Sequence, residues 1–145
     1  MFKHILIPTD GSERSARAVT QGIALAAVLD ARVTALMATP AIPPIILEGL
    51  AAPLHNEVLE QNAKDYATRS LAVAAQAAAA AGVRCETIHL EHEQPWEVII
   101  QTAEQKGCDL IVMASHGRAG VSAVVLGSET NKVLTHSKIP VLVCR

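Results

Sequence analysis

Residues 109–128 read DLIVMASHGRAGVSAVVLGS, and this stretch decides the fold class that we predict. Its first part, Asp109 to Ala114, is apolar without alternation after the aspartate, which is typical of a strand buried on both faces of a parallel sheet. A glycine-containing loop follows, and Gly127 and Ser128 then begin a helical pattern. Because ligands of open parallel sheets bind beyond the carboxyl ends of the strands, the loop from Ala114 to Ser128 is a candidate phosphate-binding segment.

Strand patterns alternate with helix patterns along the whole chain. Ser12 is a predicted N-cap, Pro95 suits the first turn of a helix, and Gly82 and Gly107 are predicted helix ends. We expect strands at residues 5–7, 32–37, 83–90, 109–114 and 140–144, separated by helices that begin near residues 12, 57, 95 and 128. This alternation predicts an α/β fold in a single domain, residues 1–145, with a five-stranded parallel open sheet and helices on both faces.

Prolines interrupt the segment after the second predicted strand: Pro40, Pro43, Pro44 and Pro53. They exclude a continuous helix there, so residues 40–55 are predicted to form a long loop that has room for a short turn of helix. Long loops in compact domains are commonly functional, and we interpret this one as a mobile flap over a ligand pocket. The last helix is more regular, and its Val133 and Leu134 are expected to face the core.

Composition and charge argue against several classes of protein. The net charge is −2 and the basic residues are scattered, so a nucleic-acid-binding face is not expected. No apolar run approaches the roughly 18 residues of a membrane span and no secretory signal is found, so we expect no membrane association and a cytoplasmic location. Cys85, Cys108 and Cys144 form no Cys-x-x-Cys pair and are expected to be buried and reduced. The histidines lack metal-ligand spacing, so no metal site is assigned.

The start of the last predicted helix has the chemistry that binds phosphate. Glycines let the backbone approach an anion closely, and a helix N-terminus offers unpaired N–H groups and a favourable dipole. The hydroxyls of Ser128 and Thr130 are expected to add donors, and Arg118 to add positive charge. The alternative is that Gly117 and Gly120 only form a tight turn. The chain has no GxxxxGK[ST] motif, no GxGxxG after the first strand and no GxSxG.

The glycines of this loop follow the pattern Gly-x2-Gly-x9-Gly-(Ser/Thr). Gly117 takes the second glycine position and Gly127-Ser128 closes the pattern, whereas Ala114 replaces the first glycine. With ILIPTDGS at residues 5–12 and PVLV at residues 140–143, the chain resembles the nucleotide-binding branch of the universal stress protein family over essentially its whole length. The resemblance implies a Rossmann-like fold of the adenine nucleotide alpha hydrolase type.

The resemblance also implies that an adenine nucleotide, ATP or AMP, is the bound ligand, with Mg²⁺ held through its phosphates. Asp10 would hold the ribose or adenine side, although an aspartate before Gly-Ser is often only a turn or cap residue. Residues at the ends of strands would line the base and the ribose: Pro8, Thr9, Ala38, Met113 and Ala114.

By the same resemblance, the phosphates would be surrounded by the loop and the last helix: Gly117, Arg118, Gly127, Ser128, Glu129 and Thr130. His116 is included among the contacts, although a loop histidine without a visible partner is more often polar surface. Ala114 would crowd the nucleotide if its backbone were left-handed, and would be tolerated if it merely ended the strand.

The family commonly dimerises through the last strand, here Val141-Leu142-Val143, and an apolar strand at a sheet edge independently favours such pairing. We expect a stress-response regulatory protein that binds ATP or AMP and acts as a sensor or through an unknown protein partner.

The alternatives are a scaffold dimer with an empty pocket and a slow ATP hydrolase. Catalysis needs a positioned base. Asp10 and His116 are the obvious candidates, and because neither has a visible partner we assign no catalytic residue.

Overall fold

The structure is a computed structural model that describes residues 1–41, 52–116 and 126–145, with residues 52–55 described in their backbone only. Over these ranges the elements follow in the order β1 (His4–Pro8), α1 (Glu13–Leu29), β2 (Arg32–Thr39), α2 (Ala52–Ala80), β3 (Cys85–Glu91), α3 (Pro95–Lys106), β4 (Leu110–Ala114), α4 (Ser128–His136) and β5 (Val141–Cys144). None of the helices in these ranges is long and apolar enough to cross a membrane.

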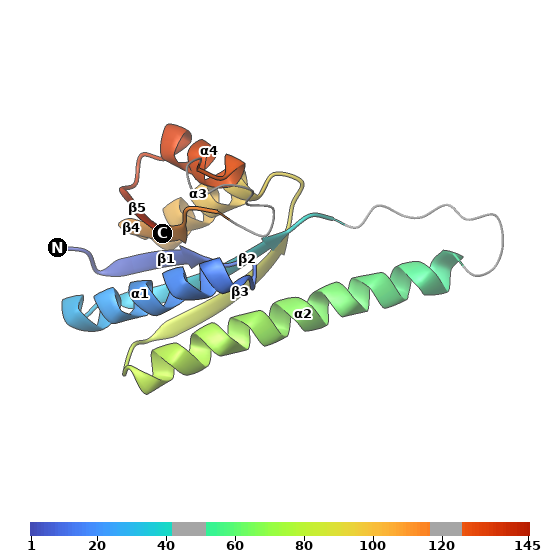
Figure 1. Cartoon of the computed structure of the whole chain (residues 1–145), viewed down its shortest axis with the longest axis horizontal. Helices are drawn as coiled ribbons and strands as arrows, with labels where there is room; N and C mark the ends of the chain where they lie inside the picture. The colour runs from blue at the N-terminus through green and yellow to red at the C-terminus, as the bar shows by residue number, and fades with distance from the viewer. Residues whose placement is uncertain (42–51, 117–125) are drawn as a thin grey trace.

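The five strands form one sheet in the order β3-β2-β1-β4-β5 (Figure 1). β1 pairs in parallel with β2 along its whole length, and on its other side it pairs in parallel with β4. The chain therefore adds β2 and β3 on one side of β1, and then returns to add β4 and β5 on the other. The strand order reverses between β1 and β4, which is where open parallel sheets bind ligands. The predicted α/β fold with a five-stranded parallel sheet is confirmed.

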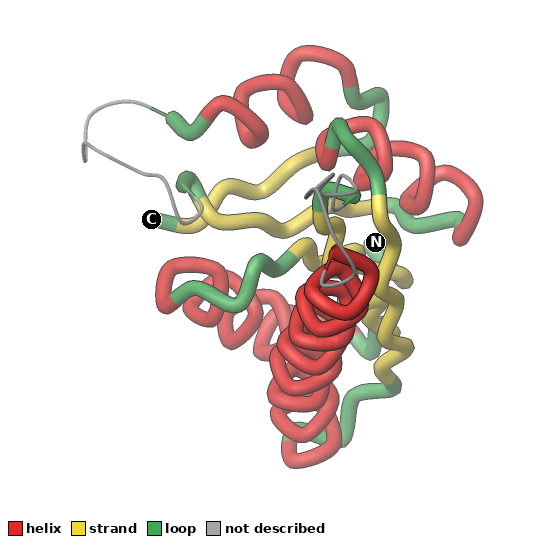
Figure 2. Tube along the Cα trace, turned by 90° about the vertical axis from the view of Figure 1, so that its right-hand side faces the viewer, coloured by secondary structure: helices red, strands yellow, loops and turns green. Residues whose placement is uncertain are grey.

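Helices cover both faces of the sheet, as predicted (Figure 2). α1 and α2 pack on one face, and α3 and α4 pack on the other. Because successive side chains of a strand point to opposite faces, β1 contributes to both cores. Ile5 and Ile7 join the cluster under α1 and α2, whereas Leu6 joins the cluster under α3 and α4. All three side chains are fully buried, so the central strand is packed from both sides.

Local signals set the ends of the helices. Ser12 caps α1, because its Oγ accepts a hydrogen bond from Ser15 N at 3.2 Å. Pro95 is the first residue of α3, where a missing N–H is tolerated because that group has no partner in the first turn. Gly107 caps the other end of α3, and its N–H donates to carbonyl oxygens of the last turn. These three predictions are confirmed.

Two predictions differ from the structure. α2 begins at Ala52 rather than at Glu57, so residues 52–55 are helical and do not belong to the loop predicted for residues 40–55. Pro53 permits this start because proline fits the first turn of a helix. The predicted flap falls mainly on residues 42–51, outside the described residues. On α4, Val133 is fully buried as predicted, but Leu134 is 39% exposed. Adjacent helical residues lie about 100° apart, so only one of the two faces the sheet.

None of the cysteines forms a disulfide. Cys108 and Cys144 are buried, as predicted, whereas Cys85 is half-buried on the edge strand β3. Burial raises the pKa of the Cys108 thiol to about 11, so this thiol stays protonated near neutral pH. Cys108 is therefore a packing group rather than a nucleophile.

The turn after β1 is packed tightly against α2. The Tyr66 hydroxyl donates to the carbonyl oxygen of Asp10 at 2.8 Å, and Gly11 has a φ of +77°. A Cβ atom at Gly11 would overlap the Tyr66 hydroxyl oxygen and would lie 2.6 Å from Ser70 Oγ. Because only glycine combines a left-handed backbone with so little space, Gly11 and Tyr66 together fix the turn.

We expect Gly11→Ala to destabilise the protein more than Gly82→Ala. Both glycines have a positive φ, +77° and +69°, but no atom lies within 4 Å of a Cβ built at Gly82. Gly82→Ala should therefore cost only the backbone strain, about 1 kcal/mol. Gly11→Ala should cost about 1–3 kcal/mol more, because Tyr66 must move and give up its hydrogen bond. Urea unfolding followed by the fluorescence of Trp96 measures both losses. Equal losses would contradict the restricted space around Gly11.

Candidate functional site

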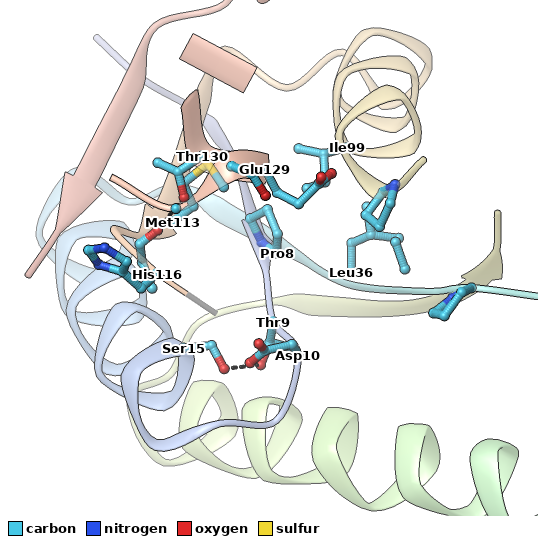
Figure 3. Close-up of a pocket in the computed structure, with 16 residues that line it drawn as sticks. Pro8, Thr9, Asp10, Ser15, Leu36, Ile99, Met113, His116, Glu129 and Thr130 are labelled. Atoms are coloured by element: carbon cyan, nitrogen blue, oxygen red, sulfur yellow. Dashed lines mark hydrogen bonds between the residues drawn. The ribbon is translucent and has the colours of Figure 1, made fainter. Parts of the chain in front are cut away.

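A cavity of about 530 Å³ opens at the carboxyl ends of β1, β2 and β4, where the strand order reverses (Figure 3). Its volume is within the range of small-molecule sites. The walls come from these strand ends, the segments that follow them, and α1, α3 and α4: Pro8, Thr9, Asp10, Ser15, Leu36, Ala38, Pro40, Pro95, Ile99, Met113, Ala114, His116, Gly127, Ser128, Glu129 and Thr130.

The turn after β1 gives the cavity a polar border. Thr9 N donates to Leu36 O at 2.8 Å, which ties the turn to β2. Thr9 Oγ1 and Ser15 Oγ are hydrogen-bonded at 3.0 Å. Asp10 Oδ1 accepts a hydrogen bond from Ser12 N at 2.9 Å. Asp10 therefore has the turn-stabilising role that was the alternative interpretation, and it also lines the cavity. Its contact with a ligand stays a prediction.

One side of the cavity is apolar. Leu36 and Ala38 lie two residues apart on β2, so their side chains point to the same face of the sheet. Met113 of β4 and Ile99 of α3 belong to the same hydrophobic cluster between the sheet and α3. All four residues line the cavity, and Figure 3 shows Ile99 and Leu36 on the side of the cavity nearest α3. The result is a slot between a strand wall and a helix wall that suits a flat ring.

The first turn of α4 forms another side of the cavity. Gly127 N donates to Ser115 O at 2.7 Å, which holds the start of the helix against the end of β4. Thr130 Oγ1 is buried and donates to Ala114 O at 2.9 Å. This hydroxyl therefore supports the strand, contrary to the expectation that it is a free donor for a ligand. Because the first N–H groups of an α-helix have no intrahelical partners, α4 offers the cavity backbone donors instead.

The carboxylate of Glu129 connects α4 to α3. Its Oε2 accepts a hydrogen bond from Trp96 N at 2.9 Å, in the first turn of α3. Its Oε1 accepts a hydrogen bond from Lys132 Nζ at 3.2 Å. The residue before α3, Gln94, makes no side-chain cap of its own, so Glu129 supplies the cap from a different helix. The side chain thus has a structural role that the sequence does not reveal, and only its backbone N–H is left for the predicted contact with phosphate.

Ala114, which takes the place of the motif's first glycine, is the last residue of β4 and pairs with Cys144 of β5. Its side chain belongs to the hydrophobic cluster under α1 and α2, on the opposite face from Met113. Among the described residues only Asp30 is a non-glycine residue with a positive φ. The backbone of Ala114 is therefore extended, and its methyl group packs in the core.

The loop after β4 is described only at its two ends. His116 is 8% exposed and lines the cavity, with its Nδ1 3.1 Å from Ser115 Oγ. The interpretation of His116 as polar surface is therefore wrong, because the end of the loop turns inward over the cavity. Gly117 and Arg118 lie outside the described residues. Where they stand relative to a ligand stays a prediction.

Few charges surround the cavity. In the described part of the chain, the lining contains the carboxylates of Asp10 and Glu129 and no lysine or arginine. No cluster of three or more potential metal ligands occurs among the described residues. With an apolar slot on one side and backbone donors on another, the arrangement can bind a molecule that joins a flat ring to an anionic group.

The whole chain, residues 1–145, matches the sequence model of the Universal stress protein family. The chain belongs to this family. It is 34% identical over 145 residues to a universal stress protein of Thermus aquaticus, and the match covers all of both chains. It is also 34% identical over 145 residues to Universal stress protein MJ0531 of Methanocaldococcus jannaschii, where the match covers all of this chain and 83% of the relative.

Solved structures confirm that this universal stress protein has a Rossmann-like α/β fold. The structure of MJ0577, from Methanocaldococcus jannaschii, superposes with a TM-score of 0.83 at 27% identity, covering 99% of this chain and 95% of the other. A universal stress protein in complex with cAMP gives a TM-score of 0.72 at 23% identity, covering 99% and 97%. A family member from Arabidopsis thaliana with AMP bound gives 0.70 at 17% identity, covering 97% and 90%.

Several cavity residues of this universal stress protein lie outside the set that the sequence predicts: Ser15, Leu36, Pro40, Pro95 and Ile99. Leu36 could have been found, because it lies two residues before Ala38 on a strand and must share its face. Pro95 and Ile99 carry no such signal. Their helical pattern predicts a buried face, but it does not say that the first turns of α3 adjoin the end of β2.

We expect Glu129→Ala to destabilise the protein by about 1 kcal/mol, because α3 loses its cap at Trp96 N. Glu129→Gln keeps an acceptor oxygen at the same position and loses only an exposed ion pair with Lys132, so it should cost about 0.5 kcal/mol or less. Urea unfolding measures the difference between the two variants. An Ala variant as stable as the parent protein would contradict the capping role.

Proposed function

We propose that this universal stress protein binds an adenine nucleotide, ATP or AMP, in the cavity at the reversal of strand order. The observation that carries the proposal is that one cavity of about 530 Å³ has both an apolar slot and the first turn of α4 in its walls. The slot suits a purine ring, and the helix start suits a phosphate group.

In this proposal the base lies in the slot formed by Leu36, Ala38 and Ile99. Pro8 and Thr9 border the base, and Met113 and Ala114 lie beside the ribose. Asp10 accepts a hydrogen bond from a ribose hydroxyl. A carboxylate has several acceptor sites, so Asp10 can make this contact while Oδ1 stays bonded to Ser12 N.

The phosphates are proposed to lie against the backbone N–H groups of Ser128, Glu129 and Thr130, beside Gly127, whose own N–H is bonded to Ser115 O. The absence of a Cβ at Gly127 lets the backbone approach the anion closely. His116 lies beside this position, and the motif places Gly117 and Arg118 there by resemblance. Because the carboxylates of Asp10 and Glu129 line the cavity, a bare triphosphate would be repelled. A monophosphate, or a triphosphate with Mg²⁺ held through its phosphates, fits these charges better.

Relatives support the choice of ligand class. The universal stress proteins with cAMP and with AMP have the same fold as this chain, with the identities given above. The extended backbone of Ala114 supports the same choice, because the alanine adds no strain at the motif position. We therefore favour an occupied site over the alternative of a scaffold with an empty pocket.

The proposed role is that of a stress-response regulator in the cytoplasm, a sensor that reports nucleotide binding to a protein partner. This role rests on the family and on a cavity built for binding. Hydrolysis would need a base aimed at a water molecule beside the phosphates. Asp10 and His116 are the candidate bases, and their contacts with Ser12 N and Ser115 Oγ hold the turn and the end of the loop in place, so we rank slow ATP hydrolysis below binding.

We expect Gly127→Val to weaken the binding of ATP and AMP by about tenfold or more, with little loss of stability. Gly127 has φ −59° and ψ 151°, a conformation that valine adopts without strain, and in this proposal the added side chain obstructs the phosphate position. Isothermal titration calorimetry measures the affinities, and chromatography of the heat-denatured protein identifies any co-purified nucleotide.

Asn131→Ala serves as the control for this experiment, because Asn131 is exposed on α4 and does not line the cavity. Its affinity should equal that of the parent protein. No heat of binding and no released nucleotide would refute the proposal, and unchanged affinity in Gly127→Val would refute the phosphate position. Phosphate release above the level of Gly127→Val would establish hydrolysis.

We also propose that the protein forms a homodimer through the edge strand β5. Leu142 is 45% exposed on β5, and Leu90 is 41% exposed on β3 at the other edge of the sheet. Leu142→Asp should convert the dimer to a monomer because it buries a charge in the proposed interface, whereas Leu90→Asp should leave the dimer intact. Sedimentation velocity measures the mass of each variant. Dissociation by Leu90→Asp alone would move the interface to β3.

A further inference from the structure

A second cavity, of about 430 Å³, opens at the amino ends of β1, β2 and β3. It lies at the opposite end of the strands from the nucleotide cavity. His4 pairs in register with Arg32, and Thr34 pairs in register with Glu86, so these side chains share the face of the sheet that α3 covers. Lys106, the last residue of α3, adds a further wall.

Most polar groups of this cavity are already satisfied within the protein. His4 is 6% exposed, and its Nε2 is 2.8 Å from Thr34 Oγ1. Its Nδ1 is 3.1 Å from the carbonyl oxygen of Lys106. Burial, together with the charge of Arg32, lowers the pKa of His4, so the ring is neutral near pH 7. Lys106 Nζ pairs with Glu86 Oε1 at 2.5 Å. His4 and Thr34 therefore form a fixed, uncharged wall.

Arg32 and Arg84 are the exception. Both line the cavity, and neither forms an ion pair with a carboxylate in the described part of the chain. Val33 pairs with Cys85 and donates to Arg84 O at 2.8 Å, so Arg32 and Arg84 lie side by side where β2 and β3 begin. Like charges in neighbouring positions of adjacent strands repel each other. The two guanidinium groups thus leave positive charge and donor capacity facing one cavity.

We propose that this cavity is a second anion site, which binds a phosphate group between Arg32 and Arg84. A guanidinium presents paired N–H donors that match the oxygens of a phosphate, and a dianion removes the repulsion between the two arginines. The phosphate belongs either to the free ion or to a small phosphate monoester, and the volume of about 430 Å³ accommodates both. The site does not depend on the nucleotide proposal, because the two cavities share no residue.

The test is a titration of the ¹⁵N-labelled full chain with inorganic phosphate and with glycerol 3-phosphate at constant ionic strength. We expect saturable shifts of the backbone N–H signals of Val33, Cys85 and Glu86. Arg32→Gln and Arg84→Gln should each weaken this binding by about tenfold or more. Both arginines are exposed, so their replacement should leave the fold intact.

Two control variants distinguish this site from the nucleotide cavity and from a general effect of positive charge. Arg14→Gln removes the same charge from an exposed position on α1 outside both cavities and should leave the shifts unchanged. Gly127→Val obstructs the nucleotide cavity and should also leave them unchanged. If glycerol 3-phosphate binds more tightly than inorganic phosphate, the ligand is a phosphate ester. If the two affinities are equal, the phosphate group alone is recognised and the free ion is the ligand. Both results support the site.

Four outcomes would overturn the proposal. Equal weakening by Arg14→Gln would attribute the binding to net charge alone. Shifts confined to residues 127–130 would assign the phosphate to the nucleotide cavity. Failure of both ligands to shift Val33 and Cys85 would show that no phosphate binds between the arginines. Equal binding of malonate, titrated in the same way, would show a general affinity for dianions rather than a phosphate site.

Discussion

β1 and β4 pair side by side in the middle of the sheet, and the chain leaves their carboxyl ends in opposite directions. After β1 it crosses to β2 over one face, and after β4 it crosses to β5 over the other. The divergence follows from the strand order, because right-handed crossovers that run to opposite sides of β1 and β4 place their helices on opposite faces of the sheet. A cavity at the point of divergence is therefore a consequence of strand order. Its chemistry then depends on the residues of the two turns and on the first turn of α4.

The central strands explain why the fold could be predicted in detail. The apolar run from Leu110 to Ala114 is typical of a strand covered on both faces. Ser12, Pro95 and Gly107 act within one helical turn of their own positions. Predictions failed where distant contacts decide the outcome. Nothing near Glu129 in the sequence indicates that its carboxylate caps α3. In the same way, nothing near His116 indicates that the loop end turns inward.

The candidate site was predictable to the extent that its residues follow strand ends. Asp10, Ala38 and Met113 occupy the positions that a parallel sheet assigns to ligand contacts, and the structure places all three around one cavity. The wall from α3 could not be predicted, because it depends on how far the helix overhangs the sheet. Ala114 shows that the residue types of a motif do not by themselves say whether a substitution in it is tolerated. Its consequence depends on backbone conformation, and the extended conformation at the end of β4 accommodates alanine.

The cap that Glu129 provides for α3 also bears on how such sequences diverge. Gln94 leaves the start of α3 uncapped by its own side chain, so position 129 serves two helices at once. Substitutions at positions 94 and 129 are therefore not independent. A homologue with serine or aspartate at position 94 would cap α3 locally, and its residue at position 129 would then be free to change with the ligand. Selection for a capped α3 thus acts jointly on positions 94 and 129, which are distant in the sequence.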